Sequence, residues 1–141
     1  MKENIKYSKE ETDMGAEAGM KSENFFAATL NEKGIFYNFD DDWYDFTVCK
    51  VKVEVKSCQI SVKDNDKIYR PGRFDFTNEE NRQKQFDENI WVCFIARHHD
   101  QFILLGFVRA QKLEMKRYIS LPQVRKLSPL SLEDWLKKVN R

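Results

Sequence analysis

Apolar and polar residues follow two different periods along this chain, and the periods predict its elements. Between residues 14 and 33, Phe26 and Leu30 lie four positions apart, as on one face of a helix, and Gly34 follows as a stop. The same spacing predicts Glu23 at the edge of this buried stripe. Between residues 50 and 57 apolar residues instead alternate with charged ones, as they do along a half-buried strand. The same reading predicts strands at 35–39, 43–48, 90–96 and 102–108, with 43–48 joined to the strand over 50–57 as a hairpin. It also predicts a helix at 78–89, with Thr77 or Asn78 as cap and Phe86 as main anchor, and a last helix capped at Ser131.

This order of elements predicts the fold class. A helix, three strands, a loop, a helix, two strands and a last helix indicate an α/β or α+β domain with a central mixed sheet flanked by helices. Residues 63–67 are expected to form a polar loop, and 69–73 a turn around Pro71-Gly72. We expect one domain over residues 12–141, with Thr12 or Asp13 as its first helix cap, after a loose charged leader at 1–11.

Composition narrows the class of protein. Apolar residues make up 41% of the chain and charged residues 33%, and no apolar run approaches the roughly 20 residues that span a bilayer. We therefore expect no membrane partner. The three cysteines are an odd set without CxxC spacing, which favours reduced thiols in an intracellular, cytoplasmic protein.

The net charge of +1 conceals an uneven distribution. Residues 1–45 contain 5 basic and 11 acidic side chains, whereas residues 109–141 contain 9 basic and 3 acidic ones. An acidic half facing a basic half suits a metal site beside a phosphate-binding surface. Solvated tails of opposite sign explain the same numbers equally well.

The candidate chemistry lies at Asp45 and in the segment 53–57. On a strand over 50–57, Lys52, Glu54 and Lys56 share the face opposite the valines. Two nearby carboxylates bind a hard cation such as Mg²⁺, and an adjacent lysine polarises an attacking water or offsets phosphate charge. The same alternation is also what any half-buried antiparallel strand displays.

A predicted helix with Glu23, a strand with Asp45 and then Glu54-Val55-Lys56 on the next strand resembles the PD-(D/E)xK nuclease superfamily. The resemblance covers about residues 14–60, and it is strongest to archaeal-type Holliday junction resolvases and restriction-endonuclease-like proteins. The chain departs from the pattern at Tyr44, which stands where the family often has proline.

The resemblance implies a restriction-endonuclease-like core and a metal-dependent endodeoxyribonuclease. Asp45, Glu54 and the carbonyl of Val55 would hold Mg²⁺ or Mn²⁺. Lys56 would orient or activate the attacking water, and Glu23 would hold a second metal or a metal-bound water. The substrate would be DNA, and the enzyme a homodimer whose interface lies on the strands within 90–108 or on the last helix with Trp135.

Two groups of basic residues are candidates for nucleic-acid contacts. Arg70 and Arg73 bracket the predicted Pro-Gly turn, and Lys112, Lys116 and Arg117 follow the last predicted strand. Exposed loop arginines and a solvated helix face are the alternatives for the two groups.

The principal alternative function is a non-catalytic module of the same fold that binds nucleic acid or protein. In that case Glu54 and Lys56 are a structural charge pair. A nuclease requires Asp45, Glu54 and Lys56 to converge, whereas a module allows them to point apart.

Overall fold

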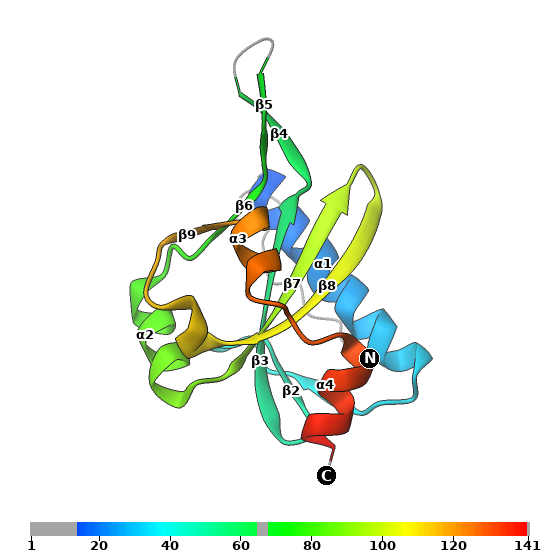
Figure 1. Cartoon of the computed structure of the whole chain (residues 1–141). Coiled ribbons are helices and arrows are strands. Elements are labelled where there is room, and N and C mark those ends of the chain that lie inside the picture. The colour runs from blue at the N-terminus through cyan, green and yellow to red at the C-terminus, as the bar shows by residue number, and fades with distance from the viewer. Residues whose placement is uncertain (1–13, 65–67, 141) are drawn as a thin grey trace.

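The computed structural model describes residues 14–64 and 68–140. The leader predicted at 1–11, the caps at Thr12 and Asp13 and part of the predicted loop at 63–67 lie outside the described residues. The elements, drawn in Figure 1, are α1 (Met14–Glu32), β1 (Tyr37–Phe39), β2 (Phe46–Val48), β3 (Val51–Gln59), β4 (Ser61–Asp64), β5 (Ile68–Pro71), β6 (Arg73–Asp75), α2 (Glu79–Glu88), β7 (Trp91–His98), β8 (Gln101–Arg109), the 3₁₀ helix η1 (Ala110–Leu113), β9 (Tyr118–Ser120), α3 (Leu121–Lys126) and α4 (Leu132–Val139).

The centre of the molecule is a mixed sheet of five strands in the order β1-β2-β3-β7-β8. The pair β3–β7 is parallel, with α2 in the crossover between the two strands, and the other neighbours are antiparallel. The predicted α+β class, with a central mixed sheet flanked by helices, is confirmed. Two small sheets, β4–β5 and β6–β9, accompany it, and Figure 1 shows the β4–β5 hairpin projecting from the rest of the molecule.

Strands β2 and β3 form the tight hairpin that the sequence predicts. Cys49 and Lys50 both have positive φ, at 49° and 69°, which is the geometry of a two-residue primed turn. This turn fixes the register, so that Val48 pairs with Val51 and Phe46 with Val53. The hairpin therefore determines where β2 ends relative to β3.

Each face of the sheet is covered by its own hydrophobic core. On one face Phe26 and Leu30 of α1 and Trp135 of α4 pack with Val53 and Val55 of β3. The core on the other face contains Val92 and Phe94 of β7, and residues of β6, η1, β9 and α3 complete it, namely Phe74, Leu113, Ile119, Leu121 and Val124. The even-numbered residues of β3, which include Glu54 and Lys56, therefore emerge on the second face.

The segment 69–73 differs from the prediction, because it forms strands and not a turn. Residues through Pro71 pair with β4, and β6 begins at Arg73 and pairs with β9. Gly72 joins the two strands, and a Cβ built there would lie 1.7 Å from the carbonyl oxygen of Gln59. Pairing of β5 with the neighbouring β4 and of β6 with the distant β9 overrides the local turn signal of Pro-Gly.

None of the helices in the described ranges combines the length and the apolar character needed to cross a membrane. Cys49, Cys58 and Cys93 are all free thiols. Burial raises the pKa of Cys58 to about 11 and that of Cys93 well above its ordinary value, so neither thiol suits the role of a nucleophile near neutral pH.

Candidate metal and nucleic-acid site

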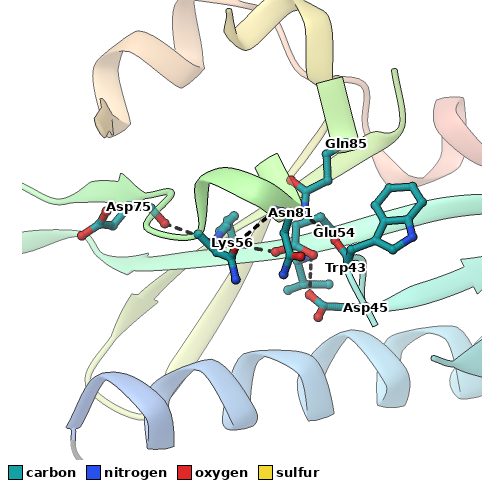
Figure 2. Close-up of polar contacts among 9 residues, drawn as sticks. Trp43, Asp45, Glu54, Lys56, Asp75, Asn81 and Gln85 are labelled. Carbon is teal, nitrogen blue, oxygen red and sulfur yellow. Dashed lines mark hydrogen bonds and ion pairs between the residues drawn. The ribbon is translucent and has the colours of Figure 1, made fainter. Parts of the chain in front are cut away.

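Asp45 occupies the point where β2 leaves β3. Its backbone N–H donates to the carbonyl of Val53, the residue that pairs with Phe46, so two residues oppose one as in a β-bulge. Beyond this point β2 no longer accompanies β3, and the N–H of Val55 donates instead to Asp45 Oδ2 at 2.9 Å. Asp45 is 4% exposed, and Figure 2 shows it on the side of β3 that faces α1. The Asp45 carboxylate therefore accepts from a backbone N–H at the edge of β3 that β2 no longer covers.

Glu54 and Lys56 lie together on the opposite face of β3. Lys56 Nζ is 3.7 Å from Glu54 Oε2, and the two side chains are 23% and 14% exposed. Lys56 Nζ also donates to the carbonyl oxygen of Asp75 at 3.1 Å (Figure 2) and lies 4.9 Å from the centre of the Phe76 ring. These contacts hold the lysine in one orientation beside the glutamate.

Arg82 of α2 adds a second cation to this face. It is 4% exposed, its guanidinium lies 3.7 Å from the centre of the Phe76 ring, and Nη2 donates to the carbonyl oxygen of Glu114 at 2.9 Å. Burial lowers the pKa of Arg82, and the charge of Glu54 acts in the opposite direction. The electrostatic interaction is mutual, so Arg82 favours the ionised form of Glu54.

Helix α2 is attached to the site by polar side chains. Asn78 caps the helix by accepting from the N–H of Asn81 at 2.9 Å, and Gln85 donates to the carbonyl of Trp43 at 2.7 Å (Figure 2). The bond from Gln85 fixes the backbone two residues before Asp45. Arg82 and Gln85 are the buried residues of α2, whereas Phe86, which the sequence suggests as the main anchor, is only half-buried.

Glu23 lies inside the buried stripe of α1, where the sequence predicts only its edge. It is 4% exposed and sits one turn before Phe26 and Ala27, which pack in the core between α1 and β3. Glu23 and the side chains of Glu54 and Lys56 therefore approach β3 from opposite faces of the sheet, and Asp45 lies at the edge that both faces share.

The predicted basic residues occupy two separate places. Arg70 and Arg73 line one pocket together with Asp75, and Arg117 lies 3.7 Å from the Asp75 carboxylate. Lys112 instead lines another pocket with Trp91 and Lys138, and Lys116 pairs with Glu114 at 3.4 Å. The cluster of three predicted over 112–117 is thus divided, because residues 110–113 turn away in η1 and the chain then enters β9.

Three contributors to this region escape sequence reasoning: Asp75, Arg82 and Arg97. Asp75 contributes its backbone carbonyl, which no side-chain pattern reveals. Arg82 stands in a helix so polar that no apolar stripe marks its buried face. Arg97 follows an apolar run and resembles an ordinary charged residue at a strand end. The burial of Arg82 and of the Arg97 Nε is visible only in the tertiary structure.

Comparison of the chain with protein-family models, with curated proteins and with solved structures finds no match.

Proposed function

We propose that this protein is a metal-dependent endonuclease of the PD-(D/E)xK type that hydrolyses phosphodiester bonds of DNA. One observation supports the proposal above the others. Glu54 and Lys56 are 3.7 Å apart on β3, and the residue between them, Val55, donates to the buried carboxylate of Asp45. Asp45 lies on the α1 side of β3, whereas Glu54 and Lys56 lie on the other face, so an ion shared by the two acids would have to bind at the open edge of the strand between them.

Each of these groups has a role in the proposed hydrolysis. Lys56, oriented by Glu54 and the Asp75 carbonyl, positions the water whose oxygen attacks phosphorus. The attacking water loses a proton to solvent, the bond from phosphorus to the leaving oxygen breaks, and that oxygen takes a proton from solvent. The positive charge of Arg82 attracts the Glu54 carboxylate, which would act as a metal ligand or a base.

The donors around Val55 suit Mg²⁺ or Mn²⁺. Asp45, Glu54 and the Val55 carbonyl all offer oxygen, the atom that hard cations prefer, and the bond to the Val55 N–H uses one of about four acceptor sites on Asp45. When bound, the ion would lower the pKa of a water and offset charge on the phosphate. Glu23, buried on the α1 side, is the candidate for holding a metal-bound water.

The substrate is tested with a labelled panel of linear duplex, single strand, flap and four-way junction, each incubated with Mg²⁺, Mn²⁺ or EDTA, together with a linear RNA duplex. The resemblance to Holliday junction resolvases predicts preferential cutting of the four-way junction. Equal cutting of all DNA forms would remove the structure-specific part of the proposal. Cutting confined to RNA would contradict the choice of DNA.

A non-catalytic binding module is the second candidate function. It is favoured by the contacts of Lys56, which has structural partners in Glu54 and Asp75, and by the absence of a cluster of three or more metal-ligating His, Cys, Asp or Glu side chains within the described residues. Mg²⁺ often uses one or two carboxylates together with substrate phosphates, so this absence does not decide between the two functions. Tight DNA binding without cutting in any metal would favour the module.

We also propose that the protein acts as a homodimer through β8, an edge strand of the central sheet. Leu130 pairs with Phe107 and covers the second half of this edge, whereas Ile103 in the first half is 47% exposed. Trp135 is 0% exposed and cannot supply the interface suggested for the last helix. Light scattering should give the mass of a dimer for the wild type and of a monomer for Ile103→Lys. A monomeric wild type would contradict this proposal.

A further inference from the structure

A pocket of about 350 Å³ lies at the carboxyl end of β3, immediately beyond Lys56. Three arginines from three different strands and one carboxylate line it, so its charge is positive. Its charged members are Arg70 of β5, Arg73 of β6, Arg97 of β7 and Asp75. Asp75 also forms the 3.7 Å ion pair with Arg117, which lies outside this lining. The pocket is therefore a basic site built from distant parts of the chain.

Arg97 contributes an unsatisfied hydrogen-bond donor to this pocket. Its Nε is buried and has no hydrogen-bond acceptor among the described residues. Burial also lowers the pKa of its guanidinium below the ordinary value, because the charge has lost part of its hydration. Arg97 as a whole is half-buried, but a buried N–H without an acceptor costs free energy, and a ligand oxygen in the pocket would offset that cost.

The neighbours of Arg97 hold the pocket in shape. Gly72 lies directly against β3, where any larger residue would strike the Gln59 backbone, and its N–H donates to the carbonyl of Ile60 at 3.1 Å. Arg73 lies 4.2 Å from the centre of the Tyr118 ring, which fixes the side chain without neutralising its charge. The pocket thus presents forked donors from a rigid base, the arrangement suited to phosphate.

We propose that this pocket binds a backbone phosphate of the DNA strand next to the phosphate that is cut. The inference rests on the proposed nuclease function and adds Arg97 to the expected contacts of Arg70 and Arg73. Asp75 connects the two places, because it lines the pocket and its backbone carbonyl accepts from Lys56 Nζ at 3.1 Å, so a DNA strand bound at Lys56 passes next to the pocket. The pocket would position the substrate, while the chemistry belongs to Asp45, Glu54 and Lys56.

The test uses the full chain in EDTA, where binding is measured without cleavage. Inorganic phosphate should shift the Arg97 Nε–Hε resonance in a saturable way in ¹⁵N NMR spectra. In anisotropy titrations with labelled duplex DNA, Arg97→Gln and, as a second variant, Arg73→Gln should each weaken binding, and each should reduce the slope of log K against log salt by about one.

Arg109→Gln is the matched control. Arg109 pairs with Trp91 at the opposite end of β7, donates to the Asn89 carbonyl at 3.0 Å and lies over the Trp91 ring, so its loss should leave the salt slope unchanged. A static Arg97 resonance, or an unchanged slope in both pocket variants, would overturn the proposal. A phosphate response without any effect on DNA binding would also overturn it, by assigning the pocket to free anions. DNA binding that depends on Arg97 in a protein that never cuts DNA would reject the nuclease and leave the pocket in place.

Discussion

Replacement of Glu54 by alanine is expected to reduce Mg²⁺-dependent DNA cleavage by about 10³-fold, because the substitution removes a metal-binding oxygen and the partner that orients Lys56. Some stability should also be lost, because Lys56 and the buried Arg82 would lose the carboxylate that offsets their charge. Single-turnover cleavage of the preferred substrate at saturating protein concentration measures the effect on the chemical step. A matched melting curve separates loss of activity from loss of folding.

Glu88→Ala provides the control for this prediction. Glu88 also forms an ion pair with a lysine of β3, because its Oε1 lies 3.0 Å from Lys52 Nζ, but both side chains of this pair are more exposed than those of Glu54 and Lys56. Removing it should leave cleavage within a factor of about two, as for most exposed ion pairs, which contribute little. Equal cleavage by the Glu54 and Glu88 variants would mean that Glu54 is merely structural.

Replacement of Trp135 by alanine is expected to lower the free energy of unfolding by about 4 kcal/mol. Trp135 is 0% exposed, and its ring stacks on Phe107 with centroids 3.9 Å apart and planes 1° apart. Because the cavity would open between α4 and β8, the surrounding sheet cannot collapse to fill it. Thermal unfolding followed by circular dichroism should show a midpoint lower by roughly 10 °C or more.

Leu136→Ala serves as the comparison within the same helix. Leu136 is only half-buried at the edge of the same core, so its truncation should cost clearly less than that of Trp135. Similar losses for both variants would indicate that α4 does not pack on the sheet through Trp135. If Trp135→Ala melted at the same temperature as the wild type, the packing of α4 against the sheet would be contradicted.

The fold was predictable where its elements have a local period. Phe26 and Leu30 mark the helical face of α1, and the alternation of valines with charges marks β3. Asn78 and Ser131 cap α2 and α4 as the sequence suggests. Strands β4, β6 and β9 were not predictable, because three or four residues are too few to show a period. The pairing of β6 with β9 also joins segments far apart in the chain. Pro71-Gly72, read as a turn, instead allows close packing against Gln59.

The candidate site was predictable only in part. The neighbourhood of Glu54 and Lys56 follows from strand alternation, whereas the placement of Asp45 depends on the bulge opposite Val53, which has no sequence signature. Glu23 was expected at the edge of a buried stripe and is inside it. Arg82 and Arg97 could not be predicted, because only tertiary contacts bring them to this region. The roles of all these residues in catalysis remain predictions.

The dependence of cleavage on Mg²⁺ tests most directly whether Asp45, Glu54 and Lys56 form a catalytic metal centre. The wild-type protein, freed of metal with EDTA and incubated with a labelled four-way junction and a linear duplex, is expected to cut DNA only after Mg²⁺ or Mn²⁺ is restored in excess. Asp45→Asn should remain inactive under the same conditions, and Asp42→Asn, in the exposed turn before Trp43, should behave like the wild type. Cutting of equal rate in EDTA, or equal activity in the Asp45 variant, would contradict the proposed centre.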